Sequence, residues 1–343
     1  MIRLATYNVE WFSALFDDAN QIVADHSWSK RHDVTKRQQL DALAHVFREI
    51  DADAVVIVEA PDQGATRSTE QALKNFRDFA GLRLDSVVTG FVSETQQEIA
   101  LLYDSAKIAA RHDPQGSEDT ATKAPRFDTK FRMDVDVDGH PDEHVFSKPP
   151  LEVALTIKES DQAMRLVGVH VKSKAPYGAR SKKAAARIAI DNRRKQLAQC
   201  NWLRARVEAH LDDGDEIIVL GDFNDGPGLD EYEKLFGKSG VEVVMGAPTP
   251  PERHLFDPHV TARLNPREAW SPATARFYSR ERKRYFNALL DFVMVSRGLI
   301  TKGRPEWRIW HPFDDEMCFE CDATRHALLT ASDHFPVTLD LDL

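Results

Sequence analysis

The sequence has few cysteines and no long hydrophobic run. Its three cysteines among 343 residues are an odd number, which argues against a framework of disulfide bonds. No apolar stretch approaches the roughly 20 residues that a membrane-spanning helix needs. The first strand is expected to begin at Ile2, which leaves no room for a signal peptide before it. These absences predict a cytoplasmic protein with no membrane partner, and they leave its oligomeric state open.

The cysteines do not complete a zinc site either. Cys318 and Cys321 form a single CxxC pair with His326 nearby, and the remaining cysteine is Cys200. A structural zinc ion takes four ligands from such residues. Free thiols in a loop are therefore the simpler interpretation, with a redox pair or a partial metal site as the alternative.

Basic residues are fewer than acidic ones. The sequence has 45 Lys and Arg residues and 55 Asp and Glu residues, so its net charge is −10. That balance alone argues against a nucleic-acid partner. The segment 172–206, however, holds eleven basic residues and a single acid, Asp191, and a second basic cluster with aromatic residues spans 276–285. Local basic patches rather than net charge set the affinity for phosphates. The alternative is that the basic helix is simply a solvated surface.

The pattern of apolar residues predicts alternating helices and strands. Helical spacing predicts helices over 36–50 and 181–211. Residues 104–126 contain few apolar side chains and several Asp, Pro and Gly residues, which predicts a loop. Alternation and an Asp-Gly turn predict a hairpin over 131–147. We expect one domain over residues 1–343, with insertions at about 104–150 and 246–288.

Polar residues recur where strand-like apolar runs end. The run 217–220 leads into Gly-Asp-Phe-Asn-Asp at 221–225, and Ser-Asp-His-Phe-Pro-Val occupies 332–337. The residues of this kind are Asn8, Glu10, Glu59, His170, Asp222, Asn224, Asp333 and His334, and Asp291 is an acid inside the apolar run 289–295. Carboxylate oxygens suit Mg²⁺, and acids, amides and imidazoles beside such a cation are the groups that split a phosphate ester. The pattern is typical of a site at the end of a sheet.

In this order, the residues resemble the endonuclease/exonuclease/phosphatase superfamily with the deoxyribonuclease I-like fold, and the resemblance spans Asn8 to His334. It implies a four-layer α/β sandwich, in which two packed mixed β-sheets are flanked by helices. It also implies hydrolysis of phosphate esters with Mg²⁺ or Mn²⁺. Substrates in the superfamily include DNA, RNA, inositol phosphates and sphingomyelin, so the resemblance specifies the chemistry better than the substrate.

The acids supply candidate metal ligands. Glu59 is the strongest, because a carboxylate at the end of five apolar residues needs a cation or hydrogen-bond donors. The resemblance adds Asp333, and it adds Glu10 where some members carry Asp. Asn8 matches the first motif of the superfamily and would hold metal or phosphate.

The remaining motif residues are candidates for the proton transfers. Asp222 would activate water, and Asn224 would point the same way if the strand continues and would donate to a phosphate oxygen. His334 would contact the phosphate, with Asp291 as the acid that orients it. In the nuclease and sphingomyelinase-like branches, a histidine at the place of His170 stabilises the transition state or protonates the leaving group.

Basic residues near these motifs are candidates for substrate binding. The string Val-His-Val-Lys-Ser-Lys at 169–174 resembles bacterial nuclease-like members, and alternation places Lys172 and Lys174 on the strand face of His170. These lysines would hold flanking phosphates, with Lys148 and Arg284 as weaker candidates. Glu98 would orient His170 or lie on the surface.

The sequence therefore predicts a Mg²⁺- or Mn²⁺-dependent phosphodiesterase that acts on nucleic acid as a nuclease. The first alternative is the same chemistry on a small molecule or a lipid headgroup. A sphingomyelinase-like role would need secretion and an exposed apolar hairpin, and the sequence shows neither clearly. A non-catalytic nucleic-acid-binding module is disfavoured because each expected catalytic position is filled. A phosphomonoesterase is less favoured because of the basic segment.

Overall fold

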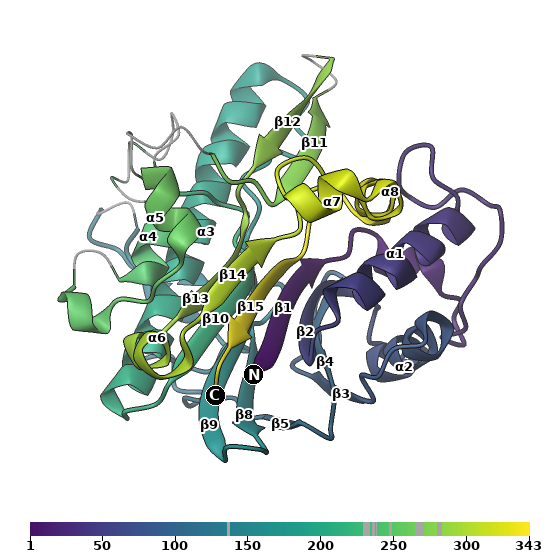
Figure 1. Cartoon of the computed structure of the whole chain (residues 1–343). Helices are drawn as coiled ribbons and strands as arrows, with labels where there is room; N and C mark the ends of the chain where they lie inside the picture. Colours follow the sequence, from purple (N-terminus) through teal and green to yellow (C-terminus); the bar gives the residue numbers. More distant parts are fainter. Residues whose placement is uncertain are drawn as a thin grey trace.

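The computed structural model describes residues 1–135, 138–228, 234, 237, 239–246, 249–264, 271–279 and 283–343. Within them, two mixed β-sheets pack face to face between two groups of helices (Figure 1). This is the four-layer α/β sandwich that the sequence predicts. The facing sides of the two sheets bury one continuous cluster of Val, Leu and Ile side chains.

The first sheet has six strands in the order β14-β15-β1-β2-β4-β3. Its central strands β1 and β2 are parallel, and the other pairs are antiparallel. The strands are β1 (Ile2–Asn8), β2 (Ala54–Ala60), β3 (Ser86–Thr89), β4 (Glu98–Tyr103), β14 (Glu306–Ile309) and β15 (Val337–Leu341).

The second sheet has five strands in the order β13-β10-β9-β8-β5, with β9 and β10 parallel. The strands are β5 (Ile108–His112), β8 (Leu151–Ile157), β9 (Gln162–His170), β10 (Ile217–Asp222) and β13 (Asp291–Val295). Strand β5 lies inside 104–126, where a loop was predicted, so that prediction is wrong. Ile108 is the one fully buried residue of this edge strand, which is why it leaves little apolar signal in the sequence.

Helices cover the outer faces of both sheets. Helix α1 (Lys36–Ile50) matches its prediction and begins with a capping box formed by Thr35 and Gln38. Helix α3 (Lys182–Asp212) agrees with its prediction to one residue at each end. Beside the first sheet lie α1, α2 (Thr69–Ala80), α7 (Glu316–Glu320) and α8 (Asp322–Ala331), and beside the second lie α3, α4 (Gly240–Met245) and α5 (Pro258–Leu264) (Figure 1).

The predicted insertions carry small elements of their own. They include the hairpins β6 (Phe131–Met133) with β7 (Asp142–His144), and β11 (Ala275–Ser279) with β12 (Arg284–Ala288). The rest of the predicted first hairpin at 136–137 lies outside the described residues.

The remaining short helices, taken over the whole described chain, are η1 (Phe12–Leu15), η3 (Pro251–Arg253) and α6 (Arg297–Gly303). No helix among the described residues has the length and apolar character to cross a bilayer.

The strand register brings polar residues together at one end of the sandwich. His170, Asp222 and Asp291 are direct neighbours across β9, β10 and β13. In the first sheet, Asn8 pairs with Val58, directly before Glu59. Because β1, β2, β9 and β10 all end here, one edge collects residues that lie far apart in the sequence.

Candidate active site

Gly221 sets the position of Asp222. Its φ of 136° is in a region that favours glycine, and an added Cβ would lie 2.1 Å from the carbonyl oxygen of Val169 on β9. The close approach of β9 and β10 therefore requires a residue with no side chain. The next residue, Asp222, is 1% exposed and ends β10 between the two sheets.

Asp222 is the most highly connected acid of the site. The amide nitrogens Nδ2 of Asn8 and of Asn224 each donate to its Oδ2 at 3.0 Å, and the backbone N–H of Asn224 donates to its Oδ1 at 2.7 Å. Burial raises the pKa of Asp222 to about 7, although the charge of His334 acts against the rise. A carboxylate with such a pKa can accept a proton near neutral pH.

Asn224 lies beside Asp222 for a different reason from the one predicted. Strand β10 ends at Asp222, and Asn224 has a φ of 49°, in the left-handed region that Asn tolerates better than most residues. Its Nδ2 also donates to the carbonyl oxygen of Val171 at 3.1 Å. A turn, not a continued strand, directs this amide toward Asp222.

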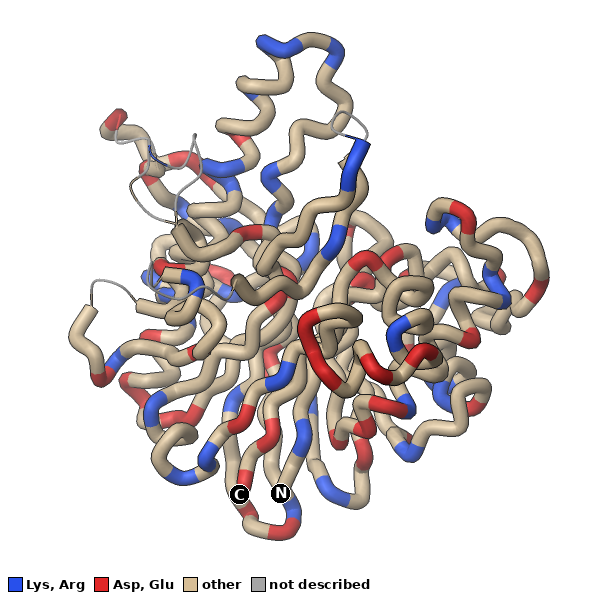
Figure 2. Tube along the Cα trace, turned by 45° about the horizontal axis from the view of Figure 1, so that its top comes forward, with Lys and Arg blue, Asp and Glu red and all other residues tan. Residues whose placement is uncertain are grey.

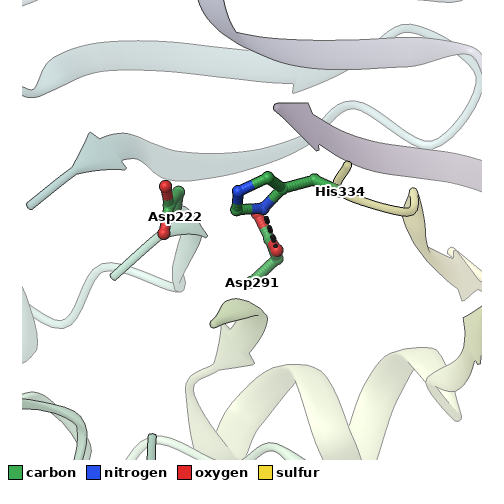
Figure 3. Close-up of side chains that lie close together, drawn as sticks. All are labelled: Asp222, Asp291 and His334. Atoms are coloured by element: carbon green, nitrogen blue, oxygen red, sulfur yellow. Dashed lines mark hydrogen bonds and ion pairs between the residues drawn. The ribbon is translucent and has the colours of Figure 1, made fainter. Parts of the chain in front are cut away.

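His334 and Asp291 form a buried pair that faces Asp222 (Figure 3). The Nδ1 of His334 is 2.8 Å from Oδ2 of Asp291. Burial acts to lower the pKa of His334, but the charges of Asp291 and Asp222 prevail and raise it well above its ordinary value. One ligand atom from each of the three residues lies within 4.8 Å of the others. Because this arrangement favours the protonated imidazole, we interpret His334 as a hydrogen-bond donor rather than a metal ligand.

His170 approaches the same carboxylate from β9. Its Nε2 lies 3.6 Å from Oδ2 of Asp222 and 3.2 Å from Nζ of Lys148. Burial and the charge of Lys148 lower the pKa of His170 well below its ordinary value, which favours the neutral ring. Glu98 does not orient this histidine or lie on the surface, because it is buried and accepts from the backbone N–H of Ser93.

Three further acids crowd together on the side of the first sheet. Glu59 stands at a β-bulge with a φ of 59°, and burial raises its pKa. Burial and the neighbouring Asp333 raise the pKa of Glu10 to about 7, although Glu10 forms an ion pair with Arg31. Ser332 fixes this arrangement, since its hydroxyl donates to the carbonyl oxygen of Asn8 at 2.8 Å and accepts from the backbone N–H of Glu10 at 3.2 Å.

The oxygen atoms at this side suit a hard cation. The buried oxygens without a hydrogen-bond partner among the described residues include Oδ1 of Asn8 and Oδ1 of Asp333 on this side, and Oδ1 of Asp291 on β13 of the second sheet. Buried oxygens that lack donors are costly, and crowded carboxylates repel one another. A divalent cation would relieve both costs, and oxygen is the donor that Mg²⁺ and Mn²⁺ prefer.

The predicted phosphate-binding lysines are placed less favourably. Lys174 forms an ion pair with Asp225, which is fully buried and also accepts from the backbone N–H of Gly240 at 2.6 Å. Asp225 is thus an anchor for its loop, beyond the turn role predicted for it. Lys172 is half-buried, and its Nζ lies 3.3 Å from the carbonyl oxygen of Ser173.

Part of the basic segment is structural. Arg204 and Arg206 are 7% and 3% exposed, and Arg206 pairs with the buried Glu152. The exposed cations of this segment lie toward the start of α3, and Figure 2 shows basic residues there and on β11–β12. Arg280 and Arg282 of the second predicted cluster lie outside the described residues.

Sequence reasoning missed the side chains that hold the site loops together. From α3, Gln196 donates to the backbone oxygens of Lys172 and Asn224, at 2.9 and 3.0 Å. Gln199 accepts from the backbone N–H of Lys172 at 2.8 Å and donates to the carbonyl oxygen of Val145 at 2.9 Å. The signal available in the sequence was the presence of two glutamines on an otherwise basic helix. Nothing in the sequence singled out Arg31, because it lies in a polar segment without a motif.

The CxxC cysteines are free thiols, as the simpler interpretation predicted, but its placement of them in a loop is wrong for Cys318, which lies in a helix. Cys318 is buried within α7, and burial raises the pKa of its thiol to about 12. Cys321 is exposed and lies between α7 and α8. A thiol with so high a pKa is a poor nucleophile and a poor metal ligand.

Comparisons with known proteins agree with this fold. A sequence model described as "Endonuclease/Exonuclease/phosphatase family" matches residues 5–334. The fold is similar to an endonuclease/exonuclease/phosphatase from Bacteroides vulgatus, with 14% identity and a TM-score of 0.53 over 100% of this chain and 98% of that chain. It is also similar to truncated Caenorhabditis elegans TDP2, with 12% identity and a TM-score of 0.50 over the same shares. No curated protein matches the sequence.

Proposed function

The chain belongs to the endonuclease/exonuclease/phosphatase family, and we propose that it is a metal-dependent phosphodiesterase that acts as a nuclease. Members of this family hydrolyse phosphate ester bonds with the help of a divalent metal ion. The observation that carries the proposal is the buried cluster of Asp222, Asp291 and His334, with the neutral ring of His170 beside it. The cluster provides a proton acceptor and a hydrogen-bond donor within reach of one phosphate group.

Each residue has a role that its surroundings favour. Asp222 accepts a proton from the attacking water, since burial raises its pKa into the neutral range. His334, protonated and oriented by Asp291, donates to a phosphoryl oxygen and stabilises the charge that develops there. His170 donates from its ring to the phosphate or to the leaving oxygen, and Asn8 and Asn224 hold Asp222 in place.

Glu59, Asp333 and Glu10 are the residues that we propose hold Mg²⁺ or Mn²⁺. Their crowding and the partnerless oxygens described above are what support this assignment. A bound divalent ion would withdraw charge from the phosphoryl oxygens and assist the departing oxygen. Glu10 contributes least, because Arg31 already neutralises it.

Cations near the site support nucleic acid as the substrate. Lys172 lies two residues beyond His170, and Arg180, Lys182, Lys183, Arg187 and Lys195 follow it in the sequence, all five of them exposed. We propose that, together with Lys148, they form a positive track that leads away from the cluster. Several cations along a path suit a polymer of phosphates better than a single phosphate group. Lys174 would join this track only if it exchanged Asp225 for a phosphate.

The experiment is hydrolysis of single-stranded DNA, duplex DNA, RNA and bis-p-nitrophenyl phosphate with Mg²⁺ or Mn²⁺. The Asp222→Asn variant serves as the control for contaminating nucleases. Cleavage of a polymer that the variant lacks would support a nuclease and identify its strand preference. Cleavage of the small diester alone would contradict the nuclease assignment and retain the chemistry. Absence of cleavage of every substrate would favour a non-catalytic binding module.

A lipid headgroup is the second candidate, because the structure does contain an exposed aromatic hairpin. Tyr278, Tyr285 and Phe286 of β11–β12 are 52%, 58% and 47% exposed, and Phe277 of the same hairpin contacts the ring of His334. The sequence had not revealed such a hairpin. Release of phosphocholine from sphingomyelin vesicles, without polymer cleavage, would favour this candidate.

A cytoplasmic location stays a prediction that cell fractionation would test.

A further inference from the structure

A cavity of about 390 Å³ lies beside Glu59. Trp11, Trp28, Lys30 and Lys36 line it, together with Gln96 and Gln97 from the loop before β4. Its volume falls within the range of small-ligand pockets. None of these lining residues takes part in the phosphate chemistry proposed above, although Glu59 forms the edge that both share.

The two tryptophans are unusually exposed for their size. Trp11 is 40% and Trp28 is 68% exposed, whereas Trp202 elsewhere in the molecule is fully buried. Large aromatic rings left in water near a polar site commonly mark a binding surface. Lys30 adds positive charge at this surface, since its Nζ lies 5.1 Å from the centre of the Trp11 ring.

Trp11 is held in a demanding backbone conformation next to the candidate metal ligand. Its φ of 61° and ψ of 27° are left-handed, which is costly for a bulky residue. Its backbone N–H donates to the carboxylate of Glu59. The position of the ring is therefore fixed relative to the proposed metal site. Strain retained at such a place is a reason to look for a function.

We propose that this cavity is a subsite in which an unpaired nucleobase of the substrate strand stacks on Trp28 and Trp11. Lys30 and Lys36 then face the phosphates that flank this base. The inference rests on the proposed nuclease function and makes it more specific. A base in a duplex is already stacked on its neighbours, so the subsite requires single-stranded nucleic acid or a frayed end.

The charges favour a nucleotide over a choline headgroup. Lys30 and Lys36 would repel a quaternary ammonium that approached the tryptophan rings. A nucleotide brings a flat ring for the tryptophans and negative charge for the lysines. The amides of Gln96 and Gln97 can donate to and accept from the edge of any base.

The test is cleavage of single-stranded oligonucleotides in which one abasic nucleotide is moved stepwise across the cleaved bond. For the unaltered protein, we expect kcat/KM to fall about 10-fold when the missing base is the one that stacks, since one stacked base contributes roughly that much. In Trp28→Ala, the same abasic substitution should change the rate less than about twofold. Trp28→Phe keeps an aromatic ring and should keep most of the discrimination, which separates stacking from loss of folding.

Phe319→Ala is the matched control, because Phe319 is also an exposed aromatic residue with an arginine over its ring but lines no part of the cavity. It should retain the full 10-fold discrimination. If no abasic position affected the unaltered protein, or if Trp28→Ala kept the discrimination, the subsite would be refuted and the nuclease function would stand. If the unaltered protein cleaved no polymer, the proposed function would fall, and the subsite with it.

Discussion

The two halves of the site are built in opposite ways. On the side of the second sheet, Asp222 and Asp291 are held by hydrogen bonds from Asn8, Asn224 and His334. On the side of the first sheet, burial and the neighbouring carboxylates raise the pKa of Glu59 and Glu10, and only Glu10 pairs with Arg31. The half beside the second sheet is held mainly by the protein's own hydrogen bonds, although Oδ1 of Asp291 has no partner, whereas the half beside the first sheet retains negative charge that its own residues do not balance.

This difference assigns separate tasks to the halves. Fixed hydrogen bonds preorganise groups that transfer protons, so that they need no rearrangement during the reaction. Unbalanced carboxylates are costly in the isolated protein and become favourable when a divalent cation binds. Substitutions in the two halves should therefore produce different defects, and the following predictions test that expectation.

The largest effect should come from Asp222→Asn. Loss of the proton acceptor should lower kcat by about 10³-fold or more. The affinity for the metal ion should change little, because Asp222 belongs to the half beside the second sheet, which hydrogen bonds within the protein hold in place. Steady-state rates over a range of Mn²⁺ concentrations would measure both quantities. A variant with near-normal kcat, or one that needs far more metal, would contradict the division between the halves.

Glu59→Gln should produce the opposite defect. The metal concentration for half-maximal activity should rise about 10- to 100-fold, with a smaller loss of kcat at saturating metal. For the unaltered protein, EDTA should abolish activity and Mg²⁺ or Mn²⁺ should restore it. Metal titrations of the activity would show this. Full activity in EDTA would mean that the crowded carboxylates serve another purpose.

Asp291→Asn should shift the pH dependence more than it lowers the maximum. Asp291 raises the pKa of His334 and so keeps the imidazole protonated above neutral pH. Without that charge the pKa of His334 falls, and the protonated form is lost at a lower pH. The alkaline limb of kcat/KM should therefore move to lower pH. An alkaline limb that did not move would show that His334 is not the group that titrates there.

Gly221→Ala should give the smallest effect, and mainly on stability. The new Cβ would collide with the carbonyl oxygen of Val169, which should lower the free energy of unfolding by about 2–3 kcal/mol. Gly214→Ala is the matched control, because Gly214 also has a positive φ of 79° but no atom within 4 Å of the added Cβ. Thermal unfolding should show a larger decrease in Tm for Gly221→Ala. Equal decreases would mean that backbone conformation alone requires glycine at position 221.

Much of the fold could be predicted because its pattern is local. Helix α1 shows clear 3.6-residue periodicity and a capping box, and the buried run of β10 ends at a turn-rich string. Strand β5 escaped prediction because an edge strand with one buried residue has almost no periodic signal. The motif residues could be chosen as candidates because each lies at or near the end of a strand-like run, yet their grouping depended on resemblance to a family.

Contacts between distant segments were beyond the sequence. Lys174 looked like a phosphate ligand, but it pairs with Asp225, 51 positions further along the chain. Arg204 and Arg206 looked like surface charge, but they are buried against carbonyl oxygens and Glu152. In each case the residue is basic, as a phosphate ligand or a surface cation should be. Its partner, however, lies in another element and could not be identified from the sequence.

The sequence by itself indicated many of the strands and helices, the acids and histidines available for chemistry, and the family to which they belong. Tertiary structure decided which of these residues meet, because two sheets bring Asn8, Asp222 and His334 together across more than 300 positions. It also decided their protonation, since burial and neighbouring charge, not residue type, raise the pKa of Asp222 and lower that of His170. Local propensity sets the elements, whereas desolvation and charge depend on their packing.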